Sequence, residues 1–287
     1  MSERDKIYLV ECPRDAIQSL SPIIPTQKKI KYYNSLIASG LFDCIDFGSF
    51  VSPASVPQMK DTGEVLLQLK KENDTQLLAI IANRTGAQQA STYQNLDFLG
   101  YPFSVSESFQ QRNANVSINQ AFEDVLYIQE LAQKQEKKLL IYVSMAFGNP
   151  YGDPWDEGIV LEWINTLKEE GISHFSLSDT TSSASPEDIT SLFQQVFHAF
   201  PELTISAHFH SNPGNRLKKI RAAYDQGCRR FEGAILGYGG CPFAQDDLVG
   251  NIPMELLLSE FTDTDEQLIF DLQEEFMQMI NGEGNDL

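Results

Sequence analysis

Short β-rich apolar runs alternate with longer helical runs along the whole chain, and this alternation restricts the fold more than any other feature. The expected strands, in order, are Ile7–Glu11, Cys44–Phe47, Leu77–Ala82, Leu96–Leu99, Leu139–Val143, Ile172–Leu177, Leu203–Phe209 and Arg230–Glu232. A helical stretch follows each of the first seven, and two helices are expected after the eighth, from about Pro253 and Thr262. Eight such units in 287 residues predict an α/β fold, the (β/α)8 TIM barrel, which needs about 250 residues. A doubly wound open sheet has the same alternation and is the alternative architecture.

Several helix ends are marked by their residue types. Thr26 is expected to cap a helix that ends at Gly40, and Ser117 with Gln120 is expected to form a capping box. The strongest start signal is Ser185–Asp188, with a capping Ser, a Pro at the first helical position and two acids.

No Pro-, Gly- or Ser-rich linker divides the chain, so a single domain is expected over residues 1–287. The barrel would occupy about residues 6–235, and a loop with a short C-terminal helical extension would occupy about residues 236–287.

Composition narrows the class of partner. The net charge of −19 makes nucleic acid a poor partner, since polyanions are repelled. The longest apolar runs fall far short of the ~20 residues that a membrane helix needs, and the N-terminus lacks signal-peptide and transit-peptide features. We therefore expect a cytoplasmic protein that neither spans a membrane nor binds nucleic acid. The four cysteines have no CxxC spacing, which predicts free, buried thiols rather than disulfides or structural zinc.

A His-x-His pair, His208 and His210, stands at the end of the seventh expected strand. Alternate residues of a strand point to the same face, so both imidazoles can meet one ion. Asp15 and Asn251 would add oxygen ligands after the first strand and after the eighth. Such a mixed N/O set suits Mg²⁺ or Mn²⁺ better than a thiolate-rich zinc site does. Two histidines hydrogen-bonded at a strand end are the simpler alternative.

Two further residues could take part in the chemistry of such a site. Arg14 places a permanent cation beside Asp15, where it could polarise a thioester carbonyl and stabilise an enolate. Cys241 lies in a glycine-rich loop, where its thiol could donate a proton to a carbanion. An ordinary salt bridge and a structural cysteine are the respective alternatives.

Taken in order, these motifs resemble those of the 3-hydroxy-3-methylglutaryl-CoA lyase family, within the metal-dependent lyases and Claisen-type condensing enzymes on TIM barrels. The matching segments are Pro13-Arg14-Asp15, Ser49-Phe50-Val51-Ser52-Pro53, Ser178-Asp179-Thr180, His208-Phe209-His210, Gly237-Tyr238-Gly239-Gly240-Cys241-Pro242-Phe243-Ala244 and Gly250-Asn251. The resemblance covers almost the whole chain, and the Ser49–Pro53 segment and the Cys241 loop point to the lyase branch.

The resemblance implies a retro-Claisen cleavage of 3-hydroxy-3-methylglutaryl-CoA to acetyl-CoA and acetoacetate, a reaction of leucine degradation and ketone-body formation. It implies that Asp15, His208, His210 and Asn251 hold a divalent cation, Mg²⁺ or Mn²⁺. It also implies catalytic roles for Arg14, Cys241, Asp46 and His208, and it allows a homodimer. The residues expected to line the acyl pocket are Gln18, Ser49, Tyr142, Asp179 and Thr180.

Some residues depart from the family pattern. The glycine before Pro-Arg-Asp is missing, Asp46 stands where a glutamate is usual, and Ser211 stands where an aspartate is usual. A relative acting on another 3-hydroxy-acyl-CoA is therefore an alternative, as are a condensing enzyme and an aldolase of the same group. A metal-dependent hydrolase and a catalytically inactive barrel used for binding are alternatives from other classes.

Overall fold

The structure is a computed structural model that describes residues 6–239 and 249–281. Eight parallel strands pair in sequence order, and β8 pairs with β1, so the sheet closes into a barrel. The strands are β1 (Tyr8–Glu11), β2 (Cys44–Ser49), β3 (Gln76–Ile80), β4 (Phe98–Ser104), β5 (Lys138–Ser144), β6 (His174–Asp179), β7 (Thr204–Ser211) and β8 (Arg230–Gly233). The predicted TIM barrel is confirmed, and the open-sheet alternative is wrong.

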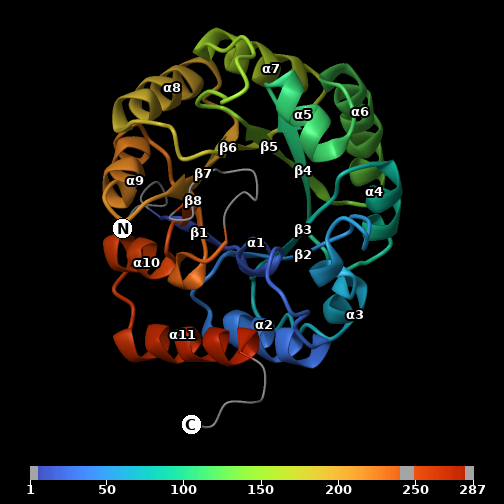
Figure 1. Cartoon of the computed structure of the whole chain (residues 1–287), viewed down its shortest axis with the longest axis vertical. Coiled ribbons are helices and arrows are strands. Elements are labelled where there is room, and N and C mark those ends of the chain that lie inside the picture. Colours follow the sequence, from blue (N-terminus) through green and yellow to red (C-terminus); the bar gives the residue numbers. More distant parts are fainter. Residues whose placement is uncertain (1–5, 240–248, 282–287) are drawn as a thin grey trace.

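Helices surround the barrel, as Figure 1 shows in a view down its axis. The outer ring consists of α2 (Thr26–Ser39), α3 (Thr62–Leu67), α4 (Arg84–Ser91), α6 (Ile118–Lys134), α7 (Glu157–Glu169), α8 (Pro186–Ala199) and α9 (Arg216–Asp225). The shorter elements are α1 (Pro13–Ile17), α5 (Glu107–Ala114), and the 3-10 helices η2 (Pro57–Met59) and η3 (Ile235–Gly237). The expected extension is present as α10 (Met254–Phe261), which contacts β8, and α11 (Glu266–Ile280), which contacts α2.

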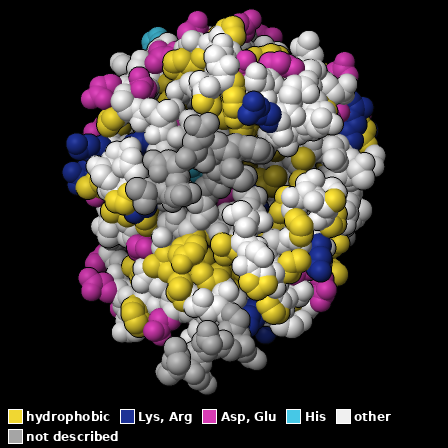
Figure 2. Space-filling view, in the orientation of Figure 1, with side chains coloured by type: hydrophobic (Ala, Val, Ile, Leu, Met, Phe, Trp, Pro, Cys, Tyr) yellow, Lys and Arg dark blue, Asp and Glu magenta, His cyan; other side chains and the backbone are white. Residues whose placement is uncertain are grey.

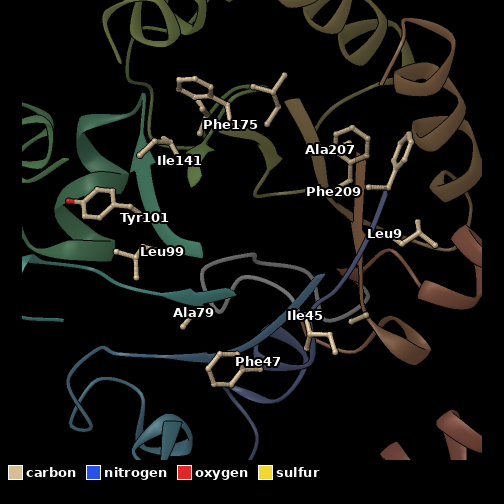
Figure 3. Close-up of a cluster of buried hydrophobic side chains, with 14 of the residues drawn as sticks. Leu9, Ile45, Phe47, Ala79, Leu99, Tyr101, Ile141, Phe175, Ala207 and Phe209 are labelled. Atoms are coloured by element: carbon tan, nitrogen blue, oxygen red, sulfur yellow. The ribbon is translucent and has the colours of Figure 1, made fainter. Parts of the chain in front are cut away.

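The side chains of the strands divide into two sets. One set points outward and packs against the helices, including Leu9, Phe47, Tyr101, Phe175 and Phe209 in Figure 3. The other set fills the barrel interior and includes Val10, Leu78, Phe98 and Leu140. This alternation follows from the two-residue period of a strand. It leaves the inward positions near the carboxyl ends of the strands for polar residues.

The fourth strand is the clearest difference from the expected boundaries. We expected Leu96–Leu99, but β4 continues to Ser104 through Gly100 and Pro102, two residues that local propensity disfavours in strands. A Cβ on Gly100 would lie 2.7 Å from Ile80 Cδ1 and 3.0 Å from a ring carbon of Tyr142. Close packing inside the barrel therefore requires a glycine here, which explains why tertiary structure overrides propensity.

The helix starts agree only in part with the sequence. Ser185 and Asp188 form the complete capping box at the start of α8. Ser117 accepts a hydrogen bond from the Gln120 N–H, but the reciprocal bond is not present, so that prediction is half right. Thr26 is the first helical residue of α2 rather than its cap, because its hydroxyl donates to Asp61 instead. The helix α5 was not expected.

Cys12, Cys44 and Cys228 are buried free thiols, as predicted. Within the described ranges, none of the helices has both the length and the apolar character needed to cross a membrane.

Candidate active site

The imidazoles of His208 and His210 lie side by side on the inward face of β7, with ring centroids 5.4 Å apart. His208 Nδ1 is 3.0 Å from Glu232 Oε2 on β8, and His210 Nδ1 is 2.9 Å from the Thr180 carbonyl oxygen. A carbonyl and a carboxylate accept hydrogen bonds, so each Nδ1 is the donor. The Nε2 atom of each ring is therefore left as an acceptor, the arrangement typical of metal-binding histidines.

Asp15 lies on α1, the short helix that starts with Pro13 directly after β1. One carboxylate oxygen accepts hydrogen bonds from Arg14 Nη1 (2.9 Å) and Gln18 Nε2 (2.7 Å). The other lies 3.8 Å from His210 Nε2. Burial raises the pKa of Asp15, but the adjacent Arg14 guanidinium outweighs it and holds this pKa well below its usual range. Asp15 is thus an ionised, buried ligand candidate.

Asn251 reaches the same point from a distant part of the chain. It lies on β9 (Gly250–Asn251), which pairs antiparallel with β7 and places Asn251 opposite His210. Its Nδ2 donates to Asp15 Oδ2 at 2.7 Å and to the Tyr238 carbonyl oxygen at 2.8 Å. In this arrangement the amide nitrogen faces Asp15, so a role as metal ligand would use Oδ1 instead.

Gly239 allows this close approach. Its φ angle is +91°, and a Cβ on it would lie 2.5 Å from the Asp15 carbonyl oxygen and 2.8 Å from Asn251 Nδ2. No other residue type fits both the backbone conformation and the available space.

Arg14 and Asp46 form a buried, two-pronged ion pair next to Asp15. Arg14 Nη2 is 2.5 Å and Nε is 3.1 Å from Asp46 Oδ2. Asp46 is fully buried on β2, and this burial raises its pKa to about 6 against the opposing effect of Arg14. The guanidinium therefore has a fixed position at the mouth of the barrel.

The donor set fits a divalent cation. Ligand atoms of Asp15, His208 and His210 all lie within 4.8 Å of one another. His210 Nε2 is buried and has no hydrogen-bond partner among the described residues. A buried acceptor left unpaired is costly unless a ligand completes it. One carboxylate with two imidazoles is a mixed oxygen and nitrogen donor set of the kind that holds a divalent cation.

Two of the expected pocket residues, Gln18 and Tyr142, contact this cluster, and a third, Ser49, lies at the end of β2. Gln18 joins Arg14 to Asp15, since its Oε1 lies 3.2 Å from Arg14 Nη1. The Tyr142 ring meets the His208 ring edge-on at 5.5 Å, and its hydroxyl is buried without a partner in the described parts of the chain. Ser49 is buried at the end of β2, where its N–H donates to Thr62 Oγ1.

The other two pocket candidates lie at the end of β6, and one of them is corrected. Ser176 points inward to Glu232, so two-residue alternation turns Asp179 outward, toward the helices. There Asp179 forms a fully buried ion pair with Lys219 Nζ of α9 at 2.5 Å. The structure therefore does not bring Asp179 into the cluster. Thr180 does lie beside the cluster, because its carbonyl oxygen meets His210, and its hydroxyl accepts a hydrogen bond from the Met145 N–H.

The sequence reasoning missed Glu232, Lys219 and Gly239. Glu232 could have been found, because alternation on the eighth strand pairs it with Arg230 on the inward face. Lys219 carried no local signal, since it stands in a basic helix segment. Cys241 lies outside the described residues.

Figure 2 views the molecule in the orientation of Figure 1 and shows acidic side chains around the rim of this face, consistent with the strongly negative net charge. Lys and Arg side chains are also visible on this face, whereas Arg14 and Lys219 are buried, each paired with an aspartate.

Comparisons with known proteins agree with this geometry. The HMGL-like family model matches residues 6–275. Hydroxymethylglutaryl-CoA lyase of Pseudomonas mevalonii is 31% identical over 249 residues, which cover 86% of this chain and 81% of that protein. The 3-hydroxy-3-isohexenylglutaryl-CoA/hydroxymethylglutaryl-CoA lyase of Pseudomonas aeruginosa is 32% identical and covers 88% of this chain and 84% of that protein.

Among solved structures, an HMG-CoA lyase from Acinetobacter baumannii in complex with coenzyme A and 3-methylmalate superposes with a TM-score of 0.89 at 30% identity. The match covers 98% of this chain and 93% of that one. Family match, sequence identity and fold agree over nearly the full length, and the chain belongs to the HMGL-like family.

Proposed function

We propose that this protein is a carbon–carbon lyase that cleaves 3-hydroxy-3-methylglutaryl-CoA to acetyl-CoA and acetoacetate with the help of a divalent cation. The observation that carries the proposal is the position of the Arg14 guanidinium, held by Asp46 directly beside the Asp15–His208–His210 cluster. A cleavage that produces an enolate needs a fixed cation at the thioester oxygen, next to a group that activates the alcohol.

Asp15, His208 and His210 would hold Mg²⁺ or Mn²⁺, joined by Asn251 through its amide oxygen. When bound, the ion would supply Lewis acidity toward the substrate oxygens. Glu232 and the Thr180 carbonyl would keep the two Nε2 atoms directed toward it.

In the reaction, the C3 hydroxyl loses its proton, the C2–C3 bond breaks, and its electron pair forms the enolate of acetyl-CoA. A proton added at C2 then completes acetyl-CoA, while C3 becomes the ketone of acetoacetate. Arg14 would stabilise the negative charge on the enolate oxygen, because its orientation is already set by Asp46 and no reorganisation is needed.

Two groups would handle the protons. Asp46 has a pKa raised to about 6 by burial, which suits a carboxylate that accepts a proton near neutrality. We assign the proton donor to C2 as Cys241, by the family resemblance. Gln18, Ser49, Tyr142 and Thr180 would contact the acyl group or its immediate surroundings, and His208 would serve both as ligand and as neighbour of Tyr142.

The test is to incubate the purified protein with 3-hydroxy-3-methylglutaryl-CoA and Mg²⁺ or Mn²⁺, with and without EDTA, and to follow acetoacetate. Cleavage that EDTA stops and added metal restores would support both the reaction and the cofactor. Absence of cleavage in protein that binds one divalent ion per chain would contradict the substrate assignment. A 3-hydroxy-3-isohexenylglutaryl thioester, named for the Pseudomonas aeruginosa relative, would then be assayed next.

A further inference from the structure

A second possible metal-binding group lies in the barrel interior next to the one just described. Ligand atoms of Cys12, His208 and Glu232 all lie within 4.8 Å of one another, and the three residues are 0%, 8% and 2% exposed. They come from the end of β1, from β7 and from β8, which are neighbouring strands. Cys12 belongs to the same interior cluster as Val10 and Tyr142, so its thiol faces the barrel axis.

The surroundings favour a cation. Glu232 and Asp46 are buried carboxylates in this part of the barrel, and the buried cations near them are Arg14 and Arg230. Arg14 is engaged by Asp46 and Asp15, whereas the partners of Glu232 are the neutral Ser176 hydroxyl (2.6 Å) and the His208 ring. Arg230 lies on the same face of β8, but its Nε and Nη2 atoms have no hydrogen-bond partner among the described residues. The Glu232 carboxylate is therefore not held by an ion pair to an arginine and can turn to an ion.

We propose that Cys12, Glu232 and His208 Nδ1 form a binding site for a soft divalent ion, Zn²⁺ in particular, which excludes the metal of the Asp15–His208–His210 group. A thiolate, an imidazole and a carboxylate form a three-residue set of the kind that zinc accepts, with a fourth position left for water. Mg²⁺ avoids thiolates, so this group discriminates between the two kinds of ion.

The exclusion follows from the shared imidazole. The His208 Nδ1 proton now lies in the hydrogen bond to Glu232. For an ion to bind there, this bond must break and the proton must move from Nδ1 to Nε2. The Cys12 thiol also loses its proton, which is released to solvent, so one proton leaves for each ion bound. A protonated Nε2 is no longer a ligand, and the group with Asp15 and His210 loses one of its members.

Cobalt provides a direct probe, because a thiolate bound to Co²⁺ gives a charge-transfer band in the near ultraviolet. Metal-depleted enzyme should develop this band on addition of Co²⁺ and lose it on addition of Zn²⁺. Saturating Mg²⁺ should weaken it if the two groups share His208. The measurement needs no acyl-CoA, so its outcome is independent of the proposed reaction.

Matched variants identify the thiol. Cys12→Ala and Cys12→Ser should lack the band, whereas Cys44→Ala, which removes the buried thiol of β2, and Cys241→Ala should keep it. Asp15→Asn, which damages only the other group, should also keep it. Circular dichroism melting without metal checks that each variant is folded, and Glu232→Gln offers a second test through weaker Co²⁺ binding if neither Cys12 variant folds.

A band that persists in folded Cys12 variants would overturn the proposal. So would its absence from the wild-type protein, or its loss in Cys241→Ala alone. A band that Mg²⁺ leaves unchanged would overturn the exclusion.

Discussion

Arg14 and Asp46 hold each other in a fixed geometry at the mouth of the barrel, with Nη2 of one 2.5 Å from Oδ2 of the other. Asp46 is wholly buried, and Arg14 is 8% exposed. Removing Arg14 would leave Asp46 charged in a dry site, whereas removing Asp46 would leave Arg14 paired with Asp15 alone. The pair therefore has separable consequences for stability and for catalysis.

Arg14→Gln should lower kcat on the order of 10³-fold, because it removes the cation proposed to stabilise the enolate. It should also reduce the free energy of unfolding by about 3–5 kcal/mol, because Asp46 and Asp15 lose their buried counter-charge. Turnover kinetics and urea denaturation measure the two effects.

The double variant Arg14→Gln/Asp46→Asn separates them. With Asp46 neutral, the part of the lost stability that comes from its unpaired charge should return. Turnover should stay low, because the enolate-stabilising cation and the proposed proton acceptor are both missing. If turnover returned together with stability, Arg14 would be a structural residue and its proposed role would be wrong.

Gly239→Ala should impair metal binding and turnover, because the new Cβ would collide with the Asp15 backbone and with Asn251. We expect Mn²⁺ affinity to fall about 10- to 100-fold, the usual effect of disturbing groups next to a metal. Isothermal titration with Mn²⁺ measures it.

Gly40→Ala is the matched control. Gly40 also has a positive φ angle, +65°, but nothing lies within 4 Å of its added Cβ. It should lose about 1 kcal/mol of stability through backbone strain and keep its Mn²⁺ affinity. Equal losses of affinity in both variants would show that strain, rather than the collision, is responsible.

The sequence predicted the barrel and much of the cluster because both depend on periodic patterns. Alternation on the seventh strand correctly places His208 and His210 on one face. The contact between Asp15 and Asn251 joins residues 236 positions apart. It could be expected only through the family resemblance.

Asp179 shows where such reasoning fails. Its position at the carboxyl end of β6 was right, but the face was wrong, because which residue of Asp179 and Thr180 points inward depends on the pairing of β6 with β7 and β5. The buried partner of Asp179 is Lys219, on a helix 40 residues away. Neither the pairing nor this contact has a local signal in the sequence.

Lys219→Met should destabilise the protein by about 3–5 kcal/mol, because it leaves Asp179 buried without its cation. Lys219 Nζ also donates to the His210 carbonyl oxygen at 3.2 Å, so it joins the end of β6 to a proposed metal ligand. We therefore expect weaker Mn²⁺ binding as well, measured by titration at a temperature where the variant is folded.

The double variant Asp179→Asn/Lys219→Met removes both charges of this pair. It should recover much of the stability while Mn²⁺ affinity stays reduced, since the bond to His210 is still missing. Wild-type affinity in the folded double variant would limit Lys219 to a packing role.

His174 should make the stability of the protein depend on pH below neutrality. Burial, Arg230 and Lys138 lower the pKa of this imidazole from 6.5 to about 4 in the folded chain. At a pH between these two values, the unfolded chain binds a proton at His174 that the folded chain does not. The contribution of His174 to the free energy of unfolding is therefore fully present above about pH 6.5 and is lost as the pH drops toward 4. Allowing for partial solvent exposure, the contribution is about 2 kcal/mol.

Urea denaturation at about pH 7 and pH 4.5 should show that His174→Gln loses less stability than the wild type by this amount. His198→Gln, which changes an exposed imidazole near the end of α8, should follow the wild type. If His174→Gln and the wild type lost stability in parallel, the acid sensitivity would lie in other groups, and the start of β6 would tolerate a charged His174.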